Sequence, residues 1–121
     1  MYLLALDAST KATGVAIFKD KELIGSSVIT ASSTDLYKRI HKMVDTILSI
    51  VEQIGIEKIV MEEVIPDHSK NTNTFKALMY LQALIHIELH DKFPKVEIEL
   101  VYPSSWRSVC GIEDGRGSKR E

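Results

Sequence analysis

The order of its periodic segments is the feature that most constrains how this sequence folds. Three short strand-like segments come first, and polar turns separate them, which predicts a β-meander. Segments with helical and strand periodicity then alternate, a pattern that favours parallel strand pairing and helices packed on a sheet. The segments are 3–6, 14–18, 23–29, 36–54, 58–62, 74–90 and 96–101. The sequence therefore predicts an α/β fold, a mixed β-sheet in the order β-β-β-α-β-α-β flanked by helices.

Two of these segments are predicted to be helices from the spacing of their apolar residues. In 36–54 the apolar residues recur every three or four positions, Thr34 or Asp35 is a suitable N-cap, and Gly55 is a suitable terminating glycine. The helix predicted over Thr74–His90 has apolar residues on more than one face, so we expect it to be covered on two sides. One face would hold Phe75, Leu78, Met79, Ile85 and Leu89, and Leu81, Leu84 and Ile87 would lie elsewhere.

Length and composition limit the class of protein. A chain of 121 residues fits one domain over 1–121, and 15 basic against 17 acidic residues neither indicate nor exclude nucleic acid as a partner. The single cysteine, Cys110, cannot form an internal disulfide, which favours a reducing, cytoplasmic setting. No apolar run approaches the ~20 residues that span a bilayer, so no membrane association is expected.

Two carboxylates each end a short apolar strand, Asp7 after 3–6 and Glu62 after 58–61. Ligands of open α/β sheets collect at the carboxyl ends of strands, and paired carboxylates there suit Mg²⁺ or Mn²⁺. Glu63 competes with Glu62, because successive strand residues point to opposite faces. The alternative is that Asp7 only caps a turn and that Glu62 is merely solvated.

The loop after the first strand has the sequence Asp7-x-Ser9-Thr10-x-x-Thr13-Gly14. Its hydroxyls and glycine would let a phosphate approach backbone donors. An ordinary tight hairpin whose hydroxyls act as local caps is the alternative.

Taken together, this opening and the strand Ile59-Val-Met-Glu-Glu-Val64 resemble the RuvC family of Holliday junction resolvases, which are RNase H-like nucleases. The stretch Tyr102-Pro-Ser-Ser-Trp-Arg-Ser-Val-Cys-Gly-Ile112 and the following Gly-Arg-Gly-Ser-Lys-Arg-Glu resemble the smaller phage and Gram-positive members. The resemblance covers almost the whole chain and implies an RNase H-like sheet.

The resemblance also implies an activity, that of a homodimer that binds four-way DNA junctions and cuts them by phosphodiester hydrolysis. Sites of this family hold two divalent cations, Mg²⁺ or Mn²⁺, on four acidic positions. Asp7 matches the first-strand aspartate and Glu62 the fourth-strand glutamate, so both are expected to be catalytic and to bind metal. The helix over Thr74–His90 matches the dimerisation helix.

DNA contacts are expected from polar and basic side chains in three segments, which are the loop after the first strand, the loop before the second helix and the C-terminal stretch. These residues are Ser9, Thr10, Lys70, Asn71, Asn73, Arg107, Lys119 and Arg120.

The chain departs from this family at its C-terminus. Family members close with a helix that carries two more acids, and the sequence stops at Glu121, where that helix would begin. We therefore expect a truncated chain with half a metal site. Two other classes stay open at this point, a fragment of a sugar-kinase or actin-like ATPase and a non-catalytic dimeric DNA-binding domain.

Overall fold

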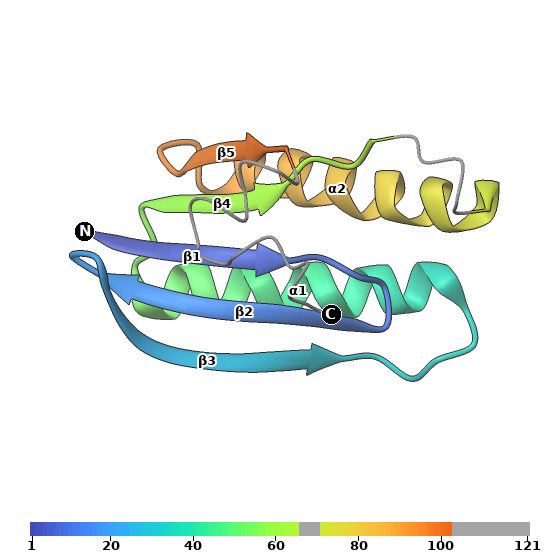
Figure 1. Cartoon of the computed structure of the whole chain (residues 1–121), viewed down its shortest axis with the longest axis horizontal. Helices are drawn as coiled ribbons and strands as arrows, with labels where there is room; N and C mark the ends of the chain where they lie inside the picture. The colour runs from blue at the N-terminus through green and yellow to red at the C-terminus, as the bar shows by residue number, and fades with distance from the viewer. Residues whose placement is uncertain (66–70, 103–121) are drawn as a thin grey trace, which may run out of the picture.

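The computed structural model describes residues 1–65 and 71–102 (Figure 1). All seven predicted elements are present, in the predicted order. They are β1 (Tyr2–Asp7), β2 (Ala12–Lys19), β3 (Glu22–Thr30), α1 (Leu36–Ile54), β4 (Lys58–Glu62), α2 (Thr72–Lys92) and β5 (Glu97–Val101).

The strands form one mixed five-stranded sheet in the order β3-β2-β1-β4-β5. β1 pairs with β4 and β4 with β5 in parallel, whereas β2 is antiparallel to both of its neighbours. The three parallel strands therefore end at the same edge of the sheet, and the β1–β2 loop lies at that edge as well (Figure 1). This confirms the predicted α/β class and the mixed sheet.

Both helices cover the same face of the sheet, behind the strands in Figure 1. In the parallel register Leu4 lies beside Ile59 and Leu6 beside Met61, and all four side chains are fully buried. Since strand side chains alternate between faces, the residues between and after them belong to the other face. Burial of these in-register pairs thus fixes which side chains of β1 and β4 are left on the face away from the helices.

Helix α1 has the ends that the sequence predicts. Asp35 is its N-cap, and the Asp35 carboxylate accepts hydrogen bonds from the backbone N–H groups of Tyr37 at 2.9 Å and Lys38 at 3.3 Å. Gly55 ends the helix with φ of 81°, in the left-handed region where a side chain would be strained. Of the two candidate N-caps, the structure selects Asp35 over Thr34.

Helix α2 is longer than predicted and buries a different face. It begins at Thr72 rather than Thr74, because Asn71 caps it by accepting the Thr74 N–H at 2.7 Å. Its buried residues recur at every fourth position and are Leu81, Ile85 and Leu89. The predicted face included Ile85 and Leu89 but was wrong in leaving out Leu81. Tertiary packing decides which face is buried, since α2 has apolar residues of its own on more than one face and periodicity alone selects no single face.

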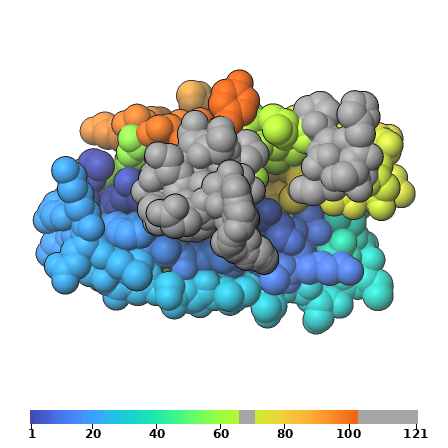
Figure 2. Space-filling view, in the orientation of Figure 1, coloured from blue at the N-terminus to red at the C-terminus, as the bar shows by residue number. Residues whose placement is uncertain are grey.

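The sheet has β3 and β5 as its edge strands, and the two differ in character. β3 runs along the lower margin of the molecule in Figure 2. β3 exposes apolar side chains, with Val28 60% exposed. Near the other edge, Lys58 of β4 pairs with Glu99 at 2.7 Å and Glu97 at 3.7 Å, and the hydrogen bond that Lys58 donates to Glu99 raises the pKa of Lys58. No helix within the described ranges is long and apolar enough to cross a membrane.

Replacing Asp35 by Ala is expected to lower the free energy of unfolding by ~1 kcal/mol, since two N–H groups of the first turn lose their acceptor. Thr34→Ala is the matched control, and its expected change is within ~0.5 kcal/mol. Urea unfolding followed by circular dichroism measures both variants. Equal losses would show that Asp35 is not the cap in solution.

Candidate metal and nucleic-acid site

Asp7 and Glu62 end the two central parallel strands of the sheet. The pairing of Leu6 with Met61 places the next residues, Asp7 and Glu62, side by side on strands ~4.8 Å apart. Both carboxylates belong to the face away from the helices, because Leu6 and Met61 point into the core. Asp7 is exposed, Glu62 is half-buried, and neither forms an ion pair with another described residue.

Glu63 lies on the opposite side of β4 and has a partner there. The Gln82 amide of α2 donates from Nε2 to the Glu63 carboxylate at 3.2 Å and accepts the Val64 N–H through Oε1 at 3.1 Å. The backbone N–H of Glu63 donates to the carbonyl of Val101 at 2.7 Å. The chain after β4 is thus tied to both α2 and β5, and Glu62, not Glu63, shares a face with Asp7.

The β1–β2 loop is closed from within by Thr13, the one buried polar residue in the described ranges. The Thr13 hydroxyl donates to the Ser9 carbonyl at 2.7 Å and accepts the Ser9 N–H at 3.1 Å. The Ser9 hydroxyl in turn accepts the Lys11 N–H at 3.4 Å. Hydroxyls of the predicted motif therefore act as local caps, which fixes the backbone directly after Asp7.

Gly14 is the cross-strand neighbour of Asp7. A Cβ built at Gly14 would lie 3.5 Å from the Cβ of Asp7, which is ordinary contact, so any larger side chain would cover this flank of the carboxylate. The glycine keeps the Asp7 carboxylate open toward β2. An open hollow of about 430 Å³ adjoins it, lined on this face by Ala5, Ala16 and Phe18 among others.

Four of the predicted DNA contacts line one open cavity of about 570 Å³ between the β1–β2 loop and the first turns of α1 and α2. They are Ser9, Thr10, Asn71 and Asn73. Asn73 lies in the first turn of α2 rather than in a loop, and Asn71 has its side-chain oxygen engaged as the N-cap. The same cavity contains Lys11 and Arg39, which the sequence analysis missed because neither stands out from ordinary surface positions. Lys70, Arg107, Lys119 and Arg120 lie outside the described residues.

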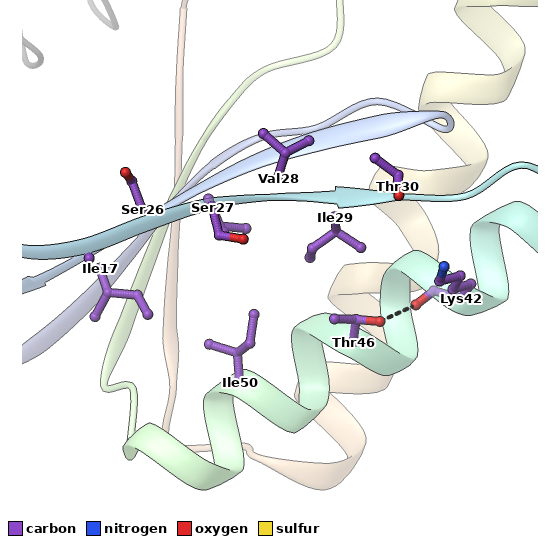
Figure 3. A pocket seen from close by; sticks show the side chains of 11 residues that line it. Ile17, Ser26, Ser27, Val28, Ile29, Thr30, Lys42, Thr46 and Ile50 are labelled. Carbon is purple, nitrogen blue, oxygen red and sulfur yellow. Dashed lines mark hydrogen bonds between the residues drawn. The ribbon is translucent and has the colours of Figure 1, made fainter.

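A further hollow, of about 450 Å³, lies between β3 and α1 (Figure 3). Ile17, Ile29 and Ile50 face this hollow. The Thr46 hydroxyl donates a hydrogen bond to the Lys42 carbonyl at 2.8 Å. Among the described residues that line the hollow there is no carboxylate, imidazole or thiol.

The carboxylates suit a hard divalent cation, but the described part of the chain supplies only a pair. Mg²⁺ is commonly held by one or two carboxylates and retains several waters, which Asp7 and Glu62 would allow. No group of three or more His, Cys, Asp or Glu residues able to hold a metal occurs in residues 1–65 and 71–102. The arrangement therefore fits part of a metal site.

Comparison with solved structures identifies the fold. RuvC of Thermus thermophilus in complex with Holliday junction substrate superposes with a TM-score of 0.73 at 12% identity, covering 98% of this chain and 84% of that one. The yeast mitochondrial Holliday junction resolvase gives 0.59 at 14% identity, covering 88% and 54%. This chain thus has a RuvC-type, RNase H-like fold, as its sequence predicts.

An ATPase-like structure is also similar, but less so. A Bacteroides thetaiotaomicron protein with an actin-like ATPase fold gives a TM-score of 0.54 at 7% identity, covering 93% of this chain and 38% of that one. No protein-family model matches the sequence, and no curated protein matches it either.

Thr13→Val is expected to lower the free energy of unfolding by about 1–3 kcal/mol, because the Ser9 N–H and carbonyl lose their partner in a buried setting. Thr13→Ser retains the hydroxyl and should keep most of the stability. Urea unfolding of both variants tests this. A valine variant as stable as the serine variant would exclude the hydroxyl as the element that closes the loop.

Proposed function

We propose that this chain is a divalent-metal-dependent endonuclease that binds and cleaves four-way DNA junctions. The observation that carries the proposal is the convergence of Asp7 and Glu62 on one face at the ends of neighbouring parallel strands. The fold supports it, since the structures with which it superposes include a RuvC bound to Holliday junction substrate.

Asp7 and Glu62 would hold the cation through their carboxylate oxygens, with further ligands from water, the scissile phosphate or other acids. When bound, such ions activate the attacking water and stabilise the charge on the leaving oxygen of an in-line displacement. Two ions are expected in the complete site, Mg²⁺ or Mn²⁺, both of which prefer oxygen ligands. The expected number of metal ions comes from the family resemblance and not from the two described carboxylates.

The chain's own residues would orient the two carboxylates and leave space for a phosphate beside them. β1 and β4 hold the two carboxylates at a fixed strand spacing, and Thr13 fixes the turn that follows Asp7. Gly14 leaves the flank of Asp7 free of a described side chain, so a phosphate can approach it on the face of the sheet away from the helices. Ser9 and Thr10 lie beyond the strand end, where their hydroxyls can donate to DNA phosphates.

A homodimer through α2 belongs to the same proposal. Tyr80, Ala83 and Ile87 are exposed and recur at spacings of three and four, so they form one stripe on α2. Tyr80 is 46% and Ile87 60% exposed. An exposed apolar stripe on a helix that also packs against α1 is typical of a self-complementary interface.

The alternatives differ in a measurable way. An actin-like ATPase fragment would bind ATP, yet the similar structure of that class is covered to only 38% by this chain. A non-catalytic DNA-binding domain would bind junctions without needing a metal.

Asp7→Asn is expected to abolish cleavage while leaving junction affinity within about twofold, because the amide keeps the shape of the side chain and removes the charge that holds the cation. A gel assay on a labelled four-way junction and a matched linear duplex, in Mg²⁺, Mn²⁺ and EDTA, measures both properties. Glu62→Gln should behave in the same way, and Glu63→Gln, on the other face, should still cut.

Undiminished cutting by the Asp7 variant would refute the site. A metal-independent shift of the junction by the wild-type chain, with no cutting in either metal, would favour the non-catalytic domain. Saturable ATP binding in calorimetry, with no junction binding, would favour the ATPase fragment.

Ile87→Glu is expected to convert a dimer into a monomer, because each copy would place an uncompensated carboxylate in the apolar stripe of α2. Light scattering coupled to size exclusion measures the mass. Leu23→Glu is the matched control, since Leu23 is 56% exposed at the start of β3 and lies outside the stripe. A wild-type chain that is monomeric at high micromolar concentration would refute the interface.

A further inference from the structure

We propose that the cavity between the β1–β2 loop and the first turns of α1 and α2 binds a backbone phosphate of the DNA, separate from the phosphate at Asp7 and Glu62. The cavity holds about 570 Å³ and is open to solvent. This inference rests on the proposed function for the identity of the polymer, and on the lining of the cavity for the ligand class.

Charge is the first argument. Two cationic side chains, Lys11 and Arg39, line the cavity, and no Asp or Glu is among the described residues that line it. Neither cation forms an ion pair with a carboxylate in the described ranges. A concave surface with two uncompensated positive charges favours an anion.

The second argument is the state of Arg39. Its Nη1 donates to the Ser33 carbonyl at 2.9 Å, which holds the guanidinium in place at the start of α1. Its Nε is buried and has no hydrogen-bond partner among the described residues. A charged guanidinium that is held in place and lines the cavity is suited to a phosphate oxygen, because guanidinium N–H groups match phosphate geometry.

The third argument is the remaining polar lining. Hydroxyl and amide groups of Ser9, Thr10, Asn73 and Thr74 surround the two cations, and these are side chains that contact phosphates in protein–DNA complexes. The Asn71 oxygen is occupied by the helix cap, so its amide N–H₂ is the group left to donate. The lining is therefore rich in donors.

Position connects the cavity to DNA rather than to a free phosphate. Ser9 follows Asp7 by two residues, so their Cα atoms are within about 7 Å of each other. Ala8 lines the cavity and packs against the core, whereas Asp7 belongs to the other face, so the loop separates the two sites. A DNA strand with one phosphate bound at Asp7 and Glu62 would run past the β1–β2 loop. Another phosphate of the same strand could then lie beside Lys11.

The test compares Lys11→Gln with Lys95→Gln, which removes the same charge from an exposed lysine between α2 and β5, at the opposite end of the sheet. Junction affinity is measured for both variants and the wild-type chain between about 50 and 200 mM salt. The plot of log affinity against log salt concentration has a negative slope, and the loss of one phosphate contact should make this slope less steep by about 0.9. Only Lys11→Gln is expected to show this change, together with weaker binding at low salt.

The other outcomes are decisive too. Equal slopes for the three proteins, with junction binding intact, would overturn the phosphate site and leave the proposed function standing. A wild-type chain that binds no junction would overturn the proposed function and this site with it. ATP or inorganic phosphate that binds saturably through Lys11, without an effect of Lys11→Gln on junction affinity, would make the cavity a site for a free phosphate group and overturn the DNA assignment.

Discussion

The in-register parallel pairing of β1 with β4 is the interaction on which the rest of this structure depends. Leu4 with Ile59 and Leu6 with Met61 form two fully buried pairs beneath the helices. A slip of β4 by one residue would move Ile59 and Met61 to the other face and out of the core, so burial fixes the register strongly. The same register places Asp7 and Glu62 together, and the candidate site is a consequence of how the core packs.

Two polar contacts then fix what lies beyond the strand ends. Thr13 closes the β1–β2 loop through both backbone groups of Ser9, and Gln82 ties the segment after β4 to α2. Each contact satisfies backbone groups that leave the sheet at this point. Because one side chain of α2 holds the end of β4, the helix proposed to form the dimer is physically connected to the strand that carries Glu62.

The edge of the sheet where the parallel strands end therefore presents two surfaces of opposite charge, separated by one short loop. The carboxylates lie on the face away from the helices, and the cavity with Lys11 and Arg39 lies on the side of the helices. Cations suit the first surface and phosphates the second. A nuclease needs both, since the metal neutralises the phosphate that reacts and basic side chains hold the polymer in register.

The sequence by itself determined the element order, the mixed sheet and the bounds of α1, and it directed attention to the acids at the strand ends, because apolar periodicity, a terminating glycine and strand-end acids are local signals. Tertiary structure decided the buried face of α2, since a helix with apolar residues on more than one face has no single preferred side until Leu81, Ile85 and Leu89 pack into the core. It also decided that Glu62 rather than Glu63 faces Asp7, through a partner 19 residues away, Gln82. That Lys11 and Arg39 line one cavity depends on how a loop and a distant helix pack, and no local pattern encodes this arrangement.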